Sequence, residues 1–147
     1  MRILVSSCLL GEDTRYDGLN SSIALNPKFR FSQKELFMDI MCENEIFSIC
    51  PEVAGGLGIP RNKAEIKSHN KPFIVIDEKE NDVTINFLIG AKKALDICLE
   101  NSIKVALFKS KSPSCGNIEV YDGTFSEKLV LEKGLTARLL EENGIKV

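Results

Sequence analysis

Three short apolar runs constrain the fold of this chain more than any other feature of its sequence. They cover residues 3–5, 46–49 and 105–108, and polar and apolar side chains do not alternate regularly within them. A strand with one face in water shows that alternation, whereas a strand covered on both faces does not. Because segments with helical periodicity separate the runs, we predict a Rossmann-like α/β fold, with a sheet of mostly parallel strands and helices on both faces.

Residues between and after these runs predict the remaining elements. Apolar side chains recur at helical spacing in residues 32–44, 87–99 and 135–140. Residues 72–76 and 145–147 are expected to add two further strands. The chain has 147 residues without repeats or a linker, which predicts one domain spanning residues 1–147.

Charge and apolar content exclude some classes of protein. Lys and Arg total 19 and Asp and Glu total 21, so the net charge of −2 disfavours a dedicated binder of duplex nucleic acid. No apolar run approaches the roughly 20 residues of a membrane span, and the N-terminal apolar run is too short for a signal peptide. We therefore expect a cytoplasmic protein, in which the five cysteines serve as thiols, metal ligands or catalysts rather than in disulfides.

Three of the five cysteines follow the predicted strands. Cys8, Cys50 and Cys115 each lie just past the carboxyl end of one apolar run. In open α/β sheets ligands bind at that edge, so parallel strands would bring the three thiols together. With a single histidine in the chain (His69), such a site suits zinc, copper(I) or an iron–sulfur cluster. The alternative is that these cysteines are small buried apolar residues, which is also our interpretation of Cys42 and Cys98 within the predicted helices.

Basic and hydroxyl side chains surround the third of these cysteines. Lys109, Lys111, Ser112 and Ser114 lie directly before Cys115. Ammonium groups, hydroxyls and the N–H groups of a turn are the components of an anion site. A solvated basic loop is the alternative interpretation.

Two further groups lie near the same predicted edge. Arg15 and Asp17 follow the first strand, where the arginine would bind an anion through two N–H groups or pair with Asp13 or Asp17. Glu52 comes two residues after Cys50, close enough to a metal edge to act as a general acid or base. An exposed loop glutamate is the alternative for Glu52.

Three separated motifs carry a resemblance to a known family. They read VSSCLLGEDTRYDG, ICPEVAGGLGIPR and KSKSPSCGNIEVYDGTFS. The sequence resembles a single-domain bacterial and archaeal family long described only as a domain of unknown function, which includes the thiouracil desulfidases. The similarity runs from Ile3 to Ile145 and includes the AEI and GLTARLL segments. Residues 62–63 and 67–71 depart from the pattern of many members and lie near the expected substrate entrance.

The resemblance implies both a cofactor and an activity. The family binds an oxygen-sensitive 4Fe-4S cluster, which aerobic preparation removes, through three cysteines that match Cys8, Cys50 and Cys115 here. Members with a known activity remove sulfur from thiolated pyrimidines such as thiouracil or 4-thiouridine monophosphate. The implied partner is thus a small thiopyrimidine or its nucleotide, with neither duplex nucleic acid nor a membrane involved.

The expected chemistry is hydrolysis without electron transfer. An iron with an open position would act as a Lewis acid toward the thiocarbonyl sulfur, water would attack the ring carbon, and sulfide would be released. We expect Glu52 to activate the water, while Ser112 and Ser114 position water or substrate. The candidates for holding a nucleotide phosphate are Arg15, Asp17, Lys109 and Lys111.

Two other functions use the same residues differently. A non-catalytic metal-binding or redox-sensing module would need the three cysteines but neither Glu52 nor an anion site. A metal-free hydrolase with a cysteine nucleophile would need only one of them. The sequence offers no His/Asp pair to activate such a nucleophile, which weakens this third hypothesis.

Overall fold

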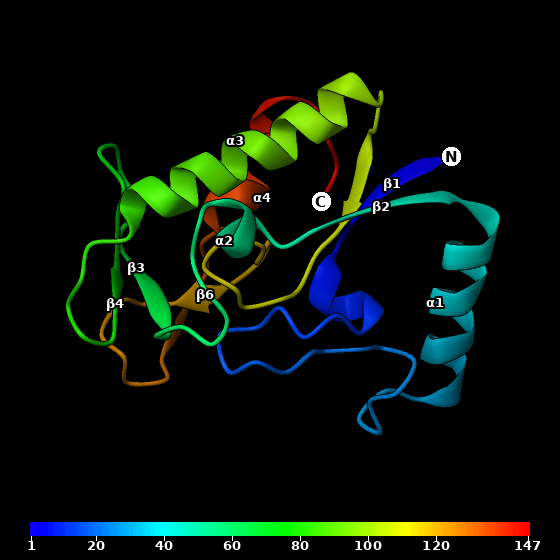
Figure 1. The fold of residues 1–147 in the computed structure, drawn as a ribbon, viewed down its shortest axis with the longest axis horizontal. Helices are drawn as coiled ribbons and strands as arrows, with labels where there is room; N and C mark the ends of the chain where they lie inside the picture. Colours follow the sequence, from blue (N-terminus) through cyan, green and yellow to red (C-terminus); the bar gives the residue numbers. More distant parts are fainter.

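A three-stranded parallel sheet lies at the centre of the protein (Figure 1). The computed structural model describes residues 1–147 and orders the strands β2–β1–β5. They are β1 (Arg2–Ser6), β2 (Glu45–Ile49) and β5 (Val105–Leu107). The central strand β1 is buried from its second residue onward, because it is paired on both edges and covered on both faces. The three apolar runs of the sequence thus form parallel strands, as predicted.

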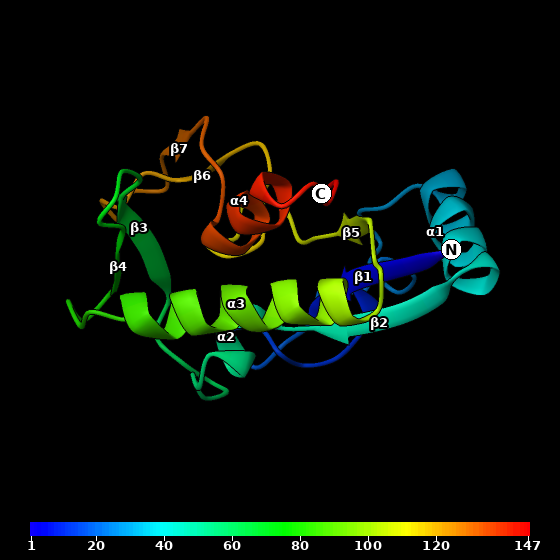
Figure 2. The same ribbon diagram turned by 90° about the horizontal axis from the view of Figure 1, so that it is seen from above.

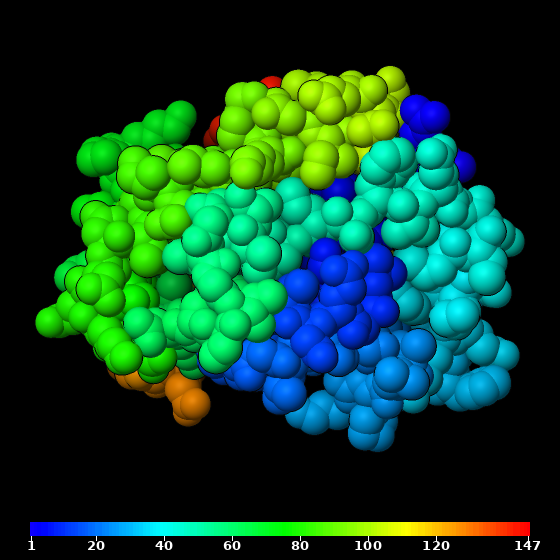
Figure 3. Space-filling view, in the orientation of Figure 1, coloured from blue at the N-terminus to red at the C-terminus, as the bar shows by residue number.

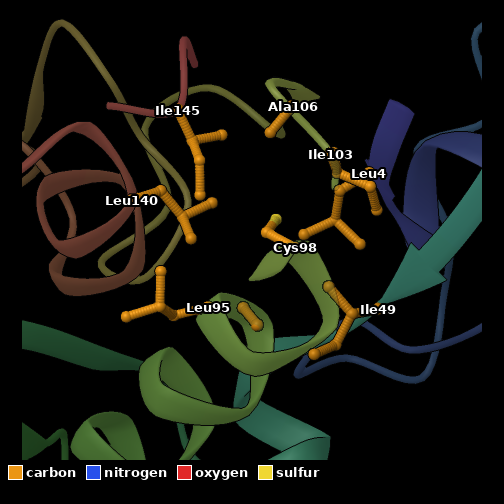
Figure 4. Close-up of a cluster of buried hydrophobic side chains, with 9 residues drawn as sticks. Leu4, Ile49, Leu95, Cys98, Ile103, Ala106, Leu140 and Ile145 are labelled. Atoms are coloured by element: carbon orange, nitrogen blue, oxygen red, sulfur yellow. The ribbon is translucent and has the colours of Figure 1, made fainter. Parts of the chain in front are cut away.

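Helices cover both faces of this sheet. Helices α3 (Thr84–Glu100) and α4 (Leu135–Glu142) pack on one face, and their core with the sheet is drawn in Figure 4. Its buried side chains are Leu4, Ile49, Ala94, Leu95, Cys98, Ile103, Ala106, Leu140 and Ile145. Helix α1 (Phe31–Glu43) packs Ile40 and Met41 against the opposite face. None of the helices has the length and apolar character needed to span a membrane.

The other strands do not extend the parallel sheet, and here the Rossmann-like prediction is not confirmed. The expected strand at residues 72–76 corresponds to β4 (Ile74–Asp77), which pairs antiparallel with β3 (Ala64–Ser68). A second antiparallel pair joins β6 (Val120–Tyr121) to β7 (Leu129–Val130). The connection between β3 and β4 is too short for the crossover that a parallel pair requires, so the two strands form a hairpin. The fold is therefore mixed α/β.

The expected C-terminal strand is reduced to a single contact. Lys146 forms one parallel bridge with Val105 of β5, and its carbonyl accepts the N–H of Ala106 at 2.8 Å. The end of the chain thus pairs with the free edge of β5 over one residue.

Helix α3 connects the parallel sheet to the antiparallel strands. In Figure 2 it runs from beside β4, at one end of the molecule, to the strands β1 and β2. Its C-terminal half contributes to the core of the parallel sheet, while Phe87 near its start belongs to a second core. The buried members of that second core are Ala64, Ile66, Val75, Phe87, Val120 and Leu135. One rigid helix therefore fixes the antiparallel hairpin relative to the carboxyl edge of the parallel sheet.

Candidate metal centre

A cavity of about 210 Å³ lies at the carboxyl edge of the parallel sheet. Cys8, Cys50 and Cys115 all line it, and none is in a disulfide. Cys8 lies in the 3-10 helix η1 (Ser7–Leu10) directly after β1, Cys50 directly follows β2, and Cys115 lies in the loop after β5. Three cysteines that are distant in sequence thus meet at one cavity, as predicted from the shared carboxyl edge of parallel strands.

The remaining two cysteines lie elsewhere. Cys98 is 1% exposed inside the core of the parallel sheet (Figure 4), and burial raises the pKa of its thiol to about 11. Cys42 lies exposed on helix α1. Neither lines the cavity. The interpretation of Cys98 as a core residue is confirmed, whereas that of Cys42 as a buried residue is wrong, because its side chain lies on the exposed face of α1.

The short helix α2 (Pro51–Ala54) places Cys50 and Glu52 at the cavity. It lies so close to α3 that a Cβ on Gly90 would come within 1.9 Å of the Pro51 carbonyl oxygen. At the end of α2, the side-chain amide of Asn86 donates to the carbonyl of Gly55 at 2.9 Å. Only glycine permits this packing, so α2 is held at a fixed distance from α3.

The loop between β5 and β6 holds Cys115 through its backbone. The Ser112 hydroxyl accepts N–H groups from Ser114 at 3.2 Å and from Cys115 at 3.1 Å. The carbonyl of Ser114 in turn accepts the N–H groups of Thr136 and Ala137 in the first turn of α4, at 2.9 and 3.1 Å. The first turn of a helix has free N–H donors, and this loop satisfies three of them, since the Pro113 carbonyl accepts the N–H of Leu135 at 3.0 Å. Cys115 is therefore fixed between the sheet and α4.

Two of the three thiols, those of Cys8 and Cys115, lie in surroundings that disfavour a bare thiolate. Burial raises the pKa of Cys8, and the neighbouring Cys50 raises it further. Burial also raises the pKa of Cys115 to about 12, although the hydroxyl of Ser6 donates to its sulfur at 3.5 Å and that of Ser114 lies 3.6 Å from it. Buried thiols of this kind become thiolates when a metal supplies the compensating positive charge.

The arrangement of donors also bears on the kind of metal group. No three or more His, Cys, Asp or Glu side chains are grouped to hold a single metal ion. A cubane cluster differs from a single ion because each thiolate binds a different iron. Three thiols that line one cavity supply one donor for each of three irons of such a cluster.

A chain of hydrogen bonds joins Glu52 to the two predicted serines. The hydroxyl of Ser114 donates to one carboxylate oxygen of Glu52 at 3.1 Å, and it lies 3.0 Å from the hydroxyl of Ser112. The other carboxylate oxygen accepts the Nε–H of Arg61 at 3.2 Å. The Glu52 side chain is 14% exposed, which excludes the alternative of a loop glutamate in open solvent.

Two lysines line the cavity near the cysteines. Burial lowers the pKa of Lys109, and the neighbouring Cys8 partly opposes that effect. The backbone N–H of Lys109 donates to the Ser6 hydroxyl at 3.0 Å. Lys111 has a left-handed backbone (φ 63°), and its ammonium lies 3.7 Å from a carboxylate oxygen of Glu119.

Arg15 lines the cavity, whereas its partner Asp17 does not. The guanidinium of Arg15 donates to the Asp17 carboxylate at 3.0 Å and to the Ser21 hydroxyl at 3.1 Å. Asp17 therefore lies behind Arg15 and orients it. Of the two interpretations of Arg15 weighed from the sequence, pairing with an aspartate is observed and anion binding stays a prediction.

Sequence reasoning missed four large side chains of the cavity, which are those of Tyr16, Arg61, Lys63 and Tyr121. The Lys63 ammonium lies 5.0 Å from the centre of the Tyr121 ring. The N–H of Arg61 donates to the Tyr16 carbonyl at 2.9 Å, and Figure 3 shows the N-terminal segment lying against the segment that contains α2. The one available signal was that Arg61 and Lys63 follow a Gly/Pro-rich loop beginning close to Cys50.

Known proteins are similar to this chain in sequence and in fold. The family model described as 2-thiouracil desulfurase matches residues 3–147. An uncharacterized protein of Bacillus subtilis (strain 168), YbbK, is 36% identical over 151 residues, covering 99% of this chain and 93% of that protein. The solved structure of TudS, described as a [4Fe-4S]-dependent thiouracil desulfidase, superposes with a TM-score of 0.82 at 38% identity, covering 99% of this chain and 88% of that chain. The resemblance found in the sequence motifs is thereby confirmed, and the chain belongs to the 2-thiouracil desulfurase family.

Proposed function

We propose that this protein is a 4Fe-4S-dependent desulfidase that removes sulfur from a thiolated pyrimidine by hydrolysis. The observation that carries the proposal is the meeting of three free cysteines and the Glu52–Ser114 pair at one cavity. Likeness to TudS, a [4Fe-4S]-dependent thiouracil desulfidase, supports the same cofactor. In the overall reaction a thiocarbonyl and water give a carbonyl and hydrogen sulfide, so no electron donor is needed.

The three thiols are the proposed cluster ligands. Cys8, Cys50 and Cys115 provide soft donors from three separate segments, and the cavity contains no histidine. When bound, the cluster supplies an iron with an open position that polarises the thiocarbonyl of the substrate. Arg15, Lys109 and Arg61 lie around the thiols and would offset the negative charge of the thiolates.

Glu52 is the proposed base for the attacking water. One of its oxygens is occupied by Arg61 and the other accepts the Ser114 hydroxyl, so the carboxylate is held in one orientation. Ser114 and Ser112 lie next to each other and supply hydroxyls that can position a water molecule or the ring of the substrate. A fixed carboxylate beside bound water is the arrangement that general base catalysis requires.

A cationic wall supports a nucleotide as substrate. Arg15, Lys109 and Lys111 all line the cavity, and Asp17 holds Arg15 from behind. A guanidinium and two ammonium groups would bind the phosphate of 4-thiouridine monophosphate. The free base lacks that phosphate and would use only the interior of the cavity.

The experiment that tests the function is sulfide release by protein reconstituted with iron and sulfide without oxygen. We expect about four irons and four sulfides per chain, and one sulfide per uracil from 2-thiouracil or per uridine monophosphate from 4-thiouridine monophosphate, without reductant. Cys8→Ser, Cys50→Ser and Cys115→Ser should each fail to hold the full cluster. Cys42→Ser is the matched control and should load like the wild type, since Cys42 lies on the surface of α1.

Two results would reject the proposal. A protein that binds no iron under these conditions excludes the cluster. A loaded protein that releases no sulfide from either substrate supports instead a non-catalytic metal-binding or redox-sensing role of the same cysteines.

A further inference from the structure

Arg61 is the most completely engaged side chain of the cavity, and the sequence motifs assign it no role. Its side chain is 8% exposed. Each of its three nitrogens has a different partner: Nε donates to Glu52 at 3.2 Å, Nη1 to the Gly58 carbonyl at 3.3 Å, and Nη2 to the Cys50 sulfur at 3.9 Å. One guanidinium thus joins the proposed base to a proposed cluster ligand.

The planar fork of arginine suits this position and an ammonium does not. A guanidinium presents N–H groups in fixed directions in one plane, whereas lysine carries its charge at a single point. Gly58 lies in the loop that leads into Arg61. The hydrogen bond from Nη1 to its carbonyl fixes the plane of the guanidinium. With the plane fixed, Nε faces the carboxylate of Glu52 while Nη2 faces the sulfur of Cys50.

We infer that Arg61 is a positioning residue with two effects. It orients the Glu52 carboxylate toward water, and it stabilises the negative charge on the sulfur of Cys50 once that thiolate holds the cluster. An N–H group directed at a ligand sulfur stabilises the reduced form of a cluster, which carries the additional negative charge. The inference rests on the proposed function, because it requires a bound cluster and a hydrolytic role for Glu52.

The test compares wild-type protein with Arg61→Lys and Arg61→Gln, all reconstituted without oxygen. Circular dichroism and iron content establish that each variant folds and loads. We expect the reduction potential of the cluster to become more negative in both variants, and kcat for sulfide release from 2-thiouracil to fall about 10–100-fold with KM nearly unchanged. Arg61→Lys should not restore either quantity, because it keeps the charge but loses the fork.

The same Arg61 substitution made in a Glu52→Gln variant separates the effect on Glu52 from the effect on Cys50. In Glu52→Gln protein, Arg61→Lys should still shift the potential, since the contact with Cys50 does not involve Glu52. Arg2→Lys is the matched control: Arg2 pairs with Glu45 on the surface, and the same substitution there should change neither potential nor kcat.

The outcomes distinguish this inference from the proposed function. An active, cluster-loaded wild type together with an Arg61→Lys variant of unchanged potential and kcat overturns the inference alone. A wild type that binds no cluster, or that binds one and releases no sulfide, overturns the proposed function and the inference with it.

Discussion

Glu52 is held by two unlike partners, a guanidinium on one carboxylate oxygen and a hydroxyl on the other. Both contacts favour a fixed carboxylate, and both leave the side chain at the wall of the cavity. Neither of these two contacts of Glu52 is with a thiol of the proposed cluster ligands. The residue should therefore be needed for turnover and not for loading.

We predict that Glu52→Gln keeps the cluster and loses activity. The amide has the size of the carboxylate but is not a base, so sulfide release should fall about 10²–10⁴-fold, the usual contribution of a general base. Iron content and the rate of sulfide release, measured on the same preparation, test this. Glu45→Gln, at an exposed ion pair, is the control. Undiminished activity of Glu52→Gln would remove Glu52 from the mechanism.

Single residues of the site differ in how far the sequence reveals them. Cys8, Cys50 and Cys115 are predictable because each directly follows or lies shortly after an apolar run, and parallel strands end at one edge. Arg61 is not predictable in this way, because its position depends on the path of a Gly/Pro-rich loop. That path is set by contacts such as the one with the Tyr16 carbonyl, which no local pattern encodes.

Packing between the elements α2 and α3 fixes the spacing of the site. A Cβ on Gly90 would lie 1.9 Å from the carbonyl oxygen of Pro51 and 2.7 Å from its carbonyl carbon. These are backbone atoms, so a side chain at position 90 has to push α2 away from α3. Such a movement displaces Cys50 and Glu52 together.

We predict that Gly90→Ala destabilises the fold by about 1–3 kcal/mol, the usual cost of overpacking, and lowers iron loading. Chemical denaturation gives the free energy of unfolding, and iron content after reconstitution gives the loading. Gly58→Ala is the control, because a Cβ added at Gly58 would lie 3.8 Å from its nearest neighbour, the Pro60 carbonyl oxygen. Wild-type loading by a destabilised Gly90→Ala would show that the spacing of α2 does not matter for the site.

Asp77 organises the turn that ends β4. Its carboxylate accepts hydrogen bonds from Asn81, from Asn62 and from the backbone N–H of Lys79. These hydrogen bonds, led by that of the Asn81 side chain, lower the pKa of Asp77 to about 2. The ionised carboxylate is therefore favoured in the folded protein relative to the unfolded chain.

The stability that Asp77 contributes should depend on pH in one direction. A lowered folded pKa means that the contribution is complete above pH 4 and is lost as pH falls toward 2. We predict that Asp77→Asn lowers the free energy of unfolding by about 1 kcal/mol at neutral pH, because solvent screens part of the interaction, and that the difference from the wild type shrinks between pH 4 and 2. Urea denaturation across that range tests this, and a difference that stays constant with pH would contradict it.

The two antiparallel hairpins show where local patterns stop predicting structure. Strand β3 was missed because charged residues interrupt it, among them Glu65, which is nevertheless 1% exposed. The Glu65 carboxylate is accommodated by the N–H groups of Gly123 and Phe125, at 3.0 and 3.2 Å, from a loop far along the chain. Strand β4 was expected, but its partner was not, since the apolar pattern shows burial and does not show pairing.

At the scale of the whole molecule, a cluster would connect three segments of the sheet. Its ligands follow β1, β2 and β5, and they come together only in the folded chain. A group that binds the native state and not the unfolded chain raises stability by its binding free energy.

We predict that cluster loading raises the Tm of the wild type measurably. A group present at 100 times its dissociation constant raises the free energy of unfolding by about 2.7 kcal/mol. Thermal unfolding without oxygen, with and without reconstitution, measures the change. Cys115→Ser should show no such gain, whereas Cys42→Ser should behave like the wild type. Equal Tm values for the apo and loaded wild type would contradict a cluster bound across the three segments.

The contact between the Ser112–Cys115 loop and the start of α4 has a consequence for how the protein is made. The loop that holds Cys115 is fixed by the N–H groups of Leu135, Thr136 and Ala137, which come after all three cysteines in the chain. A ribosome that has made the three cysteines has therefore not yet made the donors that fix Cys115. A product terminated between residues 115 and 135 would carry all three cysteines without the support that Cys115 requires. Delivery of iron and sulfur is thus expected only after residues 135–137 have been made.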